Sequence, residues 1–241
     1  MPNDTRIALV TGSNKGIGLE IARQLAQAGI HVIIGVRNSE RAKAAIADLA
    51  SQGLDVASVR IDLTDHTSIA AAAEMIRNRY GQLDILVNNA GIVDPQDGPP
   101  SAGAPEAVRR IMDTNFVGTI AVTQAMLPLL RQSPKGRIVN LSSALGSLAV
   151  MGDRSSPYYS ARLIGYNASK AALNMLTVQL AAELDETGIV INSVAPGYVK
   201  TDLTEHAGFI SAEEGARLPV HYALNSEETG LFVESAGRMP W

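Results

Sequence analysis

Short apolar runs rich in Val and Ile alternate along this chain with stretches in which apolar residues recur at helical spacing. In the first pair, residues 7–10 are apolar, apolar residues then lie four apart from Ile17 to Leu25, and Gly29 predicts the end of the helix. The runs that we predict as strands are residues 7–10, 32–36, 56–61, 85–88, 138–141, 190–194 and 231–234. Because helical stretches separate these runs, the pattern predicts a parallel, doubly wound α/β sheet with right-handed crossovers.

Several of these runs are apolar throughout instead of alternating with polar residues. Strands of that kind are covered on both faces, so we expect helices on both sides of a seven-stranded sheet. Ser39 is expected to cap the helix that ends near Ala50, and another helix is expected to begin near Thr67. No repeat, low-complexity tract or linker interrupts the sequence. We therefore predict a single domain over residues 1–241.

The composition excludes several other classes of protein. The chain contains no cysteine, which excludes disulfides and cysteine-ligated zinc and fits a reducing compartment. Its net charge of −4 argues against a nucleic-acid partner, which would need clustered Lys and Arg. The apolar runs are too short to span a membrane, residues 1–6 lack the apolar core of a signal peptide, and the four histidines form no metal-binding pattern. We expect a cytoplasmic protein without a bound metal.

A glycine-rich turn follows the first predicted strand and opens the first predicted helix. Its residues 11–18 read Thr-Gly-Ser-Asn-Lys-Gly-Ile-Gly. Glycines at such a turn allow the tight bend, the approach of the backbone to a pyrophosphate and the close packing of helix on strand, while the helix N-terminus attracts the phosphates. A glycine-rich turn without a ligand is the alternative. The position between a strand and a helix favours a Rossmann fold that binds a dinucleotide.

The end of the second strand indicates which dinucleotide binds. Sites for NAD place Asp or Glu there to accept hydrogen bonds from ribose hydroxyls. This chain has Val36 followed by Arg37, and Lys15 lies within the glycine turn. Two cations near that ribose would pair with a 2′-phosphate, so we predict NADP(H) as the cofactor. The alternative is that both are solvated surface charges.

Tyr166 and Lys170 lie one helical turn apart at the start of a predicted helix that continues to Leu184. Residues at this spacing share one face of a helix. A free phenol has a pKa of about 10, and a nearby cation would lower that pKa by roughly 1–3 units, which suits proton exchange near neutral pH. A Tyr–Lys pair is common on protein surfaces, so its meaning depends on the other motifs.

Taken in order, the motifs resemble those of the short-chain dehydrogenase/reductase family over nearly the whole chain, and those of its carbonyl-reductase-like branch in particular. They are residues 11–18, Asp62-Leu63, Asn88-Asn89-Ala90-Gly91, Asn115-Phe116-Val117-Gly118, Leu141-Ser142-Ser143, Tyr166 with Lys170, and Pro196-Gly197. The resemblance implies an NADPH-dependent oxidoreductase that reduces a ketone or an aldehyde to the alcohol. Its partner would be a small carbonyl or alcohol substrate.

The resemblance also implies roles for single residues. Tyr166 would act as general acid, and Ser143 or its neighbour Ser142 would bind the substrate oxygen, with the family pattern favouring Ser143. Lys170 would bind the nicotinamide ribose and tune Tyr166. Asn115 would hold a water that connects Lys170 to solvent, in a helix whose distortion Gly118 would permit. The implied cofactor contacts are Gly12, Asn14, Lys15, Gly16, Ile17, Gly18, Arg37, Asp62, Leu63, Asn89, Ala90, Gly91, Pro196, Gly197, Val199 and Thr201.

Two segments bear on the substrate and on self-association. Ser143 and Tyr166 are separated by 22 residues, more than in many family members. Because the extra residues precede the helix that usually pairs two subunits, the formation of a homo-oligomer is left open. Residues 198–218 are expected to form a substrate lid. Apolar residues in and near these segments allow two interpretations: they form a pocket for an apolar ketone or aldehyde substrate, or several of them only pack the lid. These residues are Leu145, Leu148, Met151, Tyr158, Leu203 and Phe209.

Other functions are compatible with the same motifs. The enzyme could oxidise an alcohol physiologically, or reduce a ketone on an acyl carrier, with the same four residues. A module that senses NADP without catalysis is a third possibility. Such modules usually lack part of the catalytic set, whereas Asn115, Ser143, Tyr166 and Lys170 are all present here.

Overall fold

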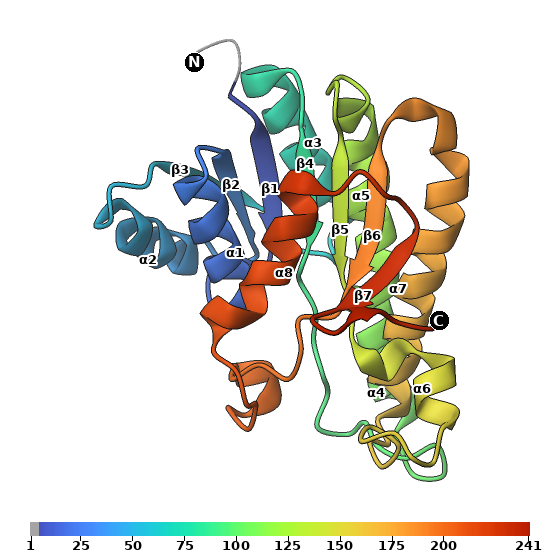
Figure 1. The fold of residues 1–241 in the computed structure, drawn as a ribbon. Helices are drawn as coiled ribbons and strands as arrows, with labels where there is room; N and C mark the ends of the chain where they lie inside the picture. Colours follow the sequence, from blue (N-terminus) through green and yellow to red (C-terminus); the bar gives the residue numbers. More distant parts are fainter. Residues whose placement is uncertain (1–4) are drawn as a thin grey trace.

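The structure, a computed structural model, describes residues 5–241. Residues 1–4, which belong to the segment predicted not to be a signal peptide, lie outside the described residues. One sheet with helices on both faces runs through the molecule (Figure 1). Its strands are β1 (Ile7–Thr11), β2 (His31–Val36), β3 (Val56–Arg60), β4 (Ile85–Asn88), β5 (Arg137–Leu141), β6 (Val190–Val194), β7 (Leu231–Glu234) and β8 (Gly237–Arg238). The α-helices are α1 (Gly16–Gln27), α2 (Ser39–Ala50), α3 (His66–Tyr80), α4 (Pro105–Met112), α5 (Gly118–Leu130), α6 (Leu148–Gly152), α7 (Ile164–Glu183) and α8 (Ala212–Asn225).

The strand order is β3-β2-β1-β4-β5-β6-β7-β8. Strands β1 to β7 are all parallel, so the predicted doubly wound Rossmann fold is confirmed. The predicted count of seven strands is one short, because β8 adds an antiparallel pair in which Val233 opposes Arg238. This strand has two residues, one of them glycine, and therefore carries no apolar pattern from which it could be predicted.

Two apolar layers hold the helices against the sheet. Adjacent residues of β1 point to opposite faces: Leu9 belongs to the apolar layer that includes residues of α3, α5 and α7, whereas Val10 belongs to the layer that includes residues of α1, α2 and α8. In Figure 1 the helices α1 and α8 lie in front of the sheet, and α3 and α5 lie behind it. Both faces of the central strands are thus covered, as their uninterrupted apolar runs predicted.

The start of α2 differs by one residue from the prediction that Ser39 caps it. The Asn38 side chain accepts hydrogen bonds from the backbone N–H groups of Glu40 and Arg41, at 2.9 and 3.1 Å. Asn and Ser are about equally good N-caps, so composition alone did not distinguish two adjacent candidates. Among residues 5–241, no helix has the length and apolarity needed to cross a membrane.

A buried polar chain crosses the sheet between β4 and β6. Asn88 Nδ2 donates to Asn140 Oδ1 at 2.8 Å and to Thr123 Oγ1 at 3.1 Å. Asn140 Nδ2 in turn donates to Thr177 Oγ1 at 2.8 Å, and that hydroxyl lies 2.8 Å from Ser193 Oγ. The chain fixes α5 and α7 to the sheet through hydrogen bonds, which are strong where water is excluded.

Asn140→Ala should destabilise the fold strongly. The change removes the central donor and acceptor of the chain. It leaves one buried N–H of Asn88 without its acceptor and Thr177 Oγ1 without the donor from Asn140, so we expect the free energy of unfolding to fall by about 2–4 kcal/mol. Urea denaturation measures it, with Gln132→Ala at an exposed position as the control. Equal stability of the two variants would contradict this account.

Candidate active site

A groove of about 790 Å³ opens where the carboxyl ends of the central strands meet. It lies beside β1, where the strand order changes direction and where parallel α/β sheets bind their ligands. Of the residues predicted from sequence, those lining it are Gly12, Asn14, Lys15, Gly16, Ile17, Gly18, Arg37, Asp62, Leu63, Asn89, Ala90, Gly91, Tyr166, Lys170, Pro196 and Thr201. The groove therefore joins the glycine turn to the Tyr–Lys pair.

The glycine turn is held in place by contacts that exclude a side chain. A Cβ on Gly18 would lie 2.4 Å from Asn89 Nδ2 and 2.7 Å from the Gly12 carbonyl oxygen. Asn89 Nδ2 donates to the carbonyls of Thr11 and Gly12, at 2.8 and 3.2 Å, and so connects the turn to the end of β4. This close packing brings the N-terminus of α1 to the groove, where its N–H groups fit the pyrophosphate of a dinucleotide.

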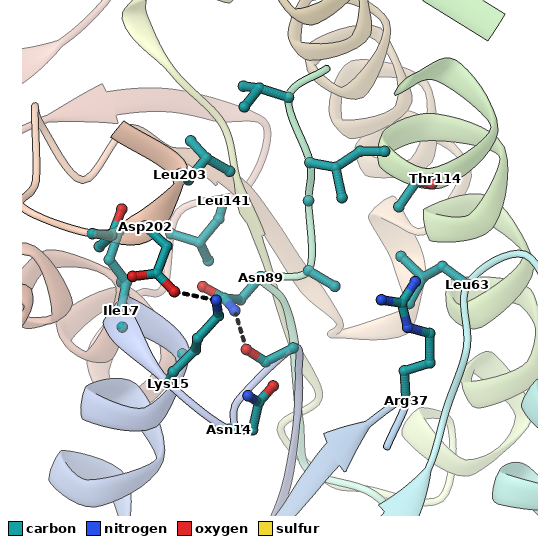
Figure 2. Close-up of a pocket in the computed structure, with 18 of the residues that line it drawn as sticks. Asn14, Lys15, Ile17, Arg37, Leu63, Asn89, Thr114, Leu141, Asp202 and Leu203 are labelled. Atoms are coloured by element: carbon teal, nitrogen blue, oxygen red, sulfur yellow. Dashed lines mark hydrogen bonds and ion pairs between the residues drawn. The ribbon is translucent and has the colours of Figure 1, made fainter. Parts of the chain in front are cut away.

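Basic side chains occur on both walls of the groove. Figure 2 shows Arg37 beside Leu63 on one wall and Lys15 on the other. Arg41, in the first turn of α2, also lines the groove. No carboxylate occupies the last position of β2, where Val36 stands, so this donor set fits the 2′-phosphate of NADP.

Lys15 has a partner that the sequence did not reveal. Its ammonium pairs with the carboxylate of Asp202, which lies in the segment after β6 (Figure 2). Asp202 also lies 3.0 Å from His206 Nε2. The hydrogen bond from the Lys15 ammonium lowers the pKa of the Asp202 carboxyl, and the positive charge of Lys15 lowers it further. The ion pair thus links the glycine turn to the predicted lid.

Tyr166 and Lys170 lie on α7 and face the groove together. Lys170 is only 5% exposed, its Nζ lies 5.5 Å from the centre of the Tyr166 ring, and Nζ donates to the Leu141 carbonyl at 2.7 Å. Burial lowers the pKa of Lys170 to about 8. The ammonium is therefore charged in most molecules at neutral pH and is anchored to the end of β5.

The expected lowering of the pKa of Tyr166 is not found. Burial raises the pKa of Tyr166 to about 12, and a hydrogen bond with Ser143 opposes that rise only in part. Burial dominates because an ionised phenol would lose its hydration in this site. The consequence is that Tyr166 holds its proton at neutral pH, which is the state that a proton donor needs.

The structure separates the two serines after β5. Ser142 is buried and its hydroxyl donates to Asn174 Oδ1 at 2.6 Å. Ser143 lies within hydrogen-bonding reach of Tyr166, and its hydroxyl also accepts from the backbone N–H of Leu145 at 3.2 Å. Of the two serines, only Ser143 is hydrogen-bonded to the phenol, although Ser142, and not Ser143, is among the residues that line the groove.

Asn115 lies behind the groove wall in a π-helical turn, Asp113–Val117, as the expected helix distortion required. Its side chain accepts from the N–H of Ile92 at 2.8 Å and donates to the carbonyl of Ile92 at 2.9 Å and to Ser169 Oγ at 3.1 Å. Its own carbonyl accepts from the Thr119 hydroxyl at 2.9 Å. Asn115 therefore clamps the loop after β4 to α7. Its predicted contact with a water stays a prediction.

Some predicted contacts lie away from the groove, and other residues line it unexpectedly. The Val199 side chain is 2% exposed and packs against Gly215, where a Cβ would lie 2.6 Å from Val199 Cγ2. Gly197 and Val199 do not contribute to the lining described here, so their cofactor contacts stay predictions. The lining residues that the sequence analysis did not single out are Asn38, Arg41, Ile61, Ile92, Val93, Thr114, Leu141, Lys200, Asp202 and His206. Ser142 and Leu203, which it did name, also line the groove. Arg41 could have been found from its position, because it is a cation in the first turn of the helix that was predicted to begin just after Arg37.

The predicted lid has two parts. Residues 198–211 are irregular apart from the short helix Asp202–Thr204, whereas residues 212–218 are the start of α8, which packs on α1. Leu203 lines the groove, but Phe209 is 82% exposed and Leu148 is 76% exposed. Among residues 5–241, no group of three or more His, Asp or Glu side chains is placed to hold a metal.

Comparisons with known proteins agree with the fold and the groove. The family profile for short chain dehydrogenases matches residues 6–208. A short-chain dehydrogenase of Penicillium roqueforti is 37% identical over 94% of this chain and 91% of that protein. Carbonyl reductase [NADPH] 3 of Mus musculus is 34% identical over 93% of this chain and 92% of that protein.

Solved structures give the same result. The NADPH-bound carbonyl reductase from chicken fatty liver superposes with a TM-score of 0.86 at 29% identity, covering 98% of this chain and 99% of that chain. The actinorhodin polyketide ketoreductase with NADPH superposes with a TM-score of 0.83 at 28% identity, over 97% of both chains. The chain is a member of the short-chain dehydrogenase/reductase family, and it is similar to that family's carbonyl reductases.

Proposed function

We propose that this oxidoreductase reduces an apolar ketone or aldehyde to the alcohol in the cytoplasm, with NADPH as its cofactor and Tyr166 as its proton donor. The observation that carries the proposal is the position of Tyr166, protonated and beside Ser143 and Lys170, on the wall of a dinucleotide-shaped groove. The lack of cysteine fits a reducing compartment.

NADP(H) is the cofactor that fits the groove and the relatives. The glycine turn and the N-terminus of α1 would hold the pyrophosphate, and Arg37 with Lys15 would hold the 2′-phosphate. The similar mouse and chicken carbonyl reductases are NADPH proteins by name. When bound, NADPH supplies the hydride that reduces the carbonyl carbon.

The residues of this chain supply the proton and fix the oxygen. Ser143 would donate a hydrogen bond to the substrate oxygen and orient the carbonyl toward Tyr166. Tyr166 would give its phenolic proton to that oxygen as negative charge develops there. Lys170, a buried cation one turn away, would stabilise the phenolate that remains, and it would also bind the nicotinamide ribose.

The groove supports a small apolar substrate. Ile92, Val93 and Leu203 are among its lining residues, and Leu203 belongs to the irregular part of the lid. A lid that covers the carbonyl excludes water from the reaction. A ketone on an acyl carrier is the second candidate substrate, because the chain is also similar to a polyketide ketoreductase. In the reverse direction, the same residues would oxidise an alcohol.

Tyr166→Phe should lower turnover by about 100- to 10,000-fold while leaving the dissociation constant for NADPH unchanged, because only the proton is removed. The measurement is NADPH oxidation with a reactive diketone or quinone. Tyr159→Phe, the same change in the segment before α7, is the matched control and should keep full turnover. Near-normal turnover of Tyr166→Phe would end the mechanism proposed here.

Ser142→Ala and Ser143→Ala should fail in different ways. Ser143→Ala removes the hydrogen bond to the substrate oxygen, so we expect turnover to fall by about 100-fold with little change in thermal stability. Ser142→Ala leaves Asn174 Oδ1 without its donor, so we expect a loss of about 1–3 kcal/mol in the free energy of unfolding and near-normal turnover. The reverse assignment of the two defects would refute the choice of Ser143.

The low pKa of Lys170 predicts how stability depends on pH in the cofactor-free enzyme. The pKa is lowered to about 8, so between pH 8 and 10 the unfolded chain binds more protons than the folded chain and stability rises with pH. Tyr166, whose pKa is raised, opposes this only above pH 10. Lys170→Met should remove a rise of about 2 kcal/mol, measured by denaturation across that range. Exposed Lys135→Met is the control, and equal slopes for the two variants would refute the assignment.

A further inference from the structure

The N-terminus of α7 carries the proposed proton donor but lacks a capping residue of its own. Leu163 stands at the N-cap position, and its aliphatic side chain cannot accept a hydrogen bond. The first N–H groups of a helix have no partner within the helix and need acceptors from elsewhere. Tyr166 is the third residue of this helix, so whatever accepts from its N–H also fixes the start of the catalytic turn.

Asp97, in the loop between β4 and α4, supplies those acceptors. Its Oδ1 accepts from the N–H of Gly165 at 2.9 Å, and its Oδ2 accepts from the N–H of Tyr166 at 2.9 Å. The N–H of Ile164 donates to the Gly98 carbonyl at 2.9 Å. The remaining early N–H, that of Asn167, donates to the Leu163 carbonyl at 2.8 Å. All four early N–H groups of α7 therefore have partners, and the loop provides three of them.

The packing around Gly165 is built for this contact. A Cβ on Gly165 would lie 2.9 Å from Ile111 Cδ1 and 3.2 Å from Asp97 Oδ1. Any side chain there would push α7 away from α4 and from the carboxylate. Asp97 also accepts from the N–H of Gly98 at 2.9 Å, which holds its own side chain in the capping orientation.

The loop that presents Asp97 is itself fixed to the groove. Arg110 on α4 donates to Asp94 at 2.8 Å and to Gln96 at 3.0 Å. Further back in the loop, Asn115 binds both backbone groups of Ile92, which lines the groove. The loop is thus a rigid connection between the cofactor groove and the first turn of α7.

We propose that Asp97 is a positioning residue for the reaction: its carboxylate caps α7 across a separation of 69 residues and fixes Tyr166 relative to the groove wall. A carboxylate at a helix N-terminus is also favoured by the helix dipole. The inference rests on the proposed role of Tyr166 as proton donor. A shift of the phenol by a fraction of an ångström to an ångström is enough to reduce turnover.

Asp97→Ala separates positioning from simple stability. We expect faster hydrogen exchange at the Gly165 and Tyr166 amides, a fall in kcat of roughly 10- to 100-fold, and unchanged NADPH affinity. Asp97→Asn, which keeps one acceptor, should give an intermediate kcat. Asp153→Ala, which removes a carboxylate that accepts only within its own exposed turn, is the matched control and should leave kcat unchanged.

Leu163→Ser in the Asp97→Ala background decides what the carboxylate does. A serine at the N-cap restores a local cap without the connection to the loop, so amide protection should recover while kcat stays low. Recovery of kcat as well, unchanged amide exchange in Asp97→Ala, or normal kcat in Asp97→Ala would each overturn the proposal. If instead Tyr166→Phe keeps normal turnover, the proposed function fails, and the exchange result still shows whether Asp97 caps the helix.

Discussion

The parallel pairing of β1, β4, β5 and β6 is the constraint on which the site depends. Because each crossover connection starts every strand from the same end of the sheet, the carboxyl ends of all four strands lie side by side at the opposite end. The registers that pair Val10 with Val87, Asn88 with Asn140 and Leu141 with Val194 set how far each end projects. The glycine turn, the Asn89 segment, Ser143 and Pro196 meet there although they lie far apart in sequence. A one-residue slip in any pair would move a wall of the groove and reverse its side chains.

The periodic parts of the fold could be predicted from the sequence, and the parts without a period could not. The central parallel strands follow from apolar runs buried on both faces, where hydrophobic burial and pattern agree, whereas the edge strand β3 is half exposed. Strand β8 depends instead on where the chain turns back after β7. The N-cap of α2 is Asn38 and not Ser39, and the sequence did not distinguish them because both residue types are good N-caps. The hydrogen-bonded chain from Asn88 to Ser193 is also long-range, since its members come from five different elements.

Local motifs predicted most of the groove lining, because glycine turns and strand ends are short-range features. The contacts that tune the site are tertiary. Lys15, which we propose to hold the 2′-phosphate together with Arg37, also pairs with Asp202 across 187 residues, and no local pattern indicates that partner. The pKa of Tyr166 was expected to fall next to Lys170, but spacing on a helix says nothing of burial, and burial dominates. Asp97 gave no signal at all, because nothing near it in sequence requires a cap.

The opposite pKa shifts of Tyr166 and Lys170 have one cause and a chemical consequence. Burial penalises each charged form, so the phenol keeps its proton and the ammonium holds its proton less tightly than in water. Charges in such a site interact more strongly than in solvent. The Lys170 cation, anchored by the Leu141 carbonyl, would therefore strongly stabilise negative charge that develops beside it. In the proposed mechanism, the phenol therefore releases its proton when that negative charge develops and keeps it until then. Proton transfer depends on the distance between the phenol and the oxygen that receives the proton. The connection from the groove to the start of α7 matters because it fixes the position of the phenol.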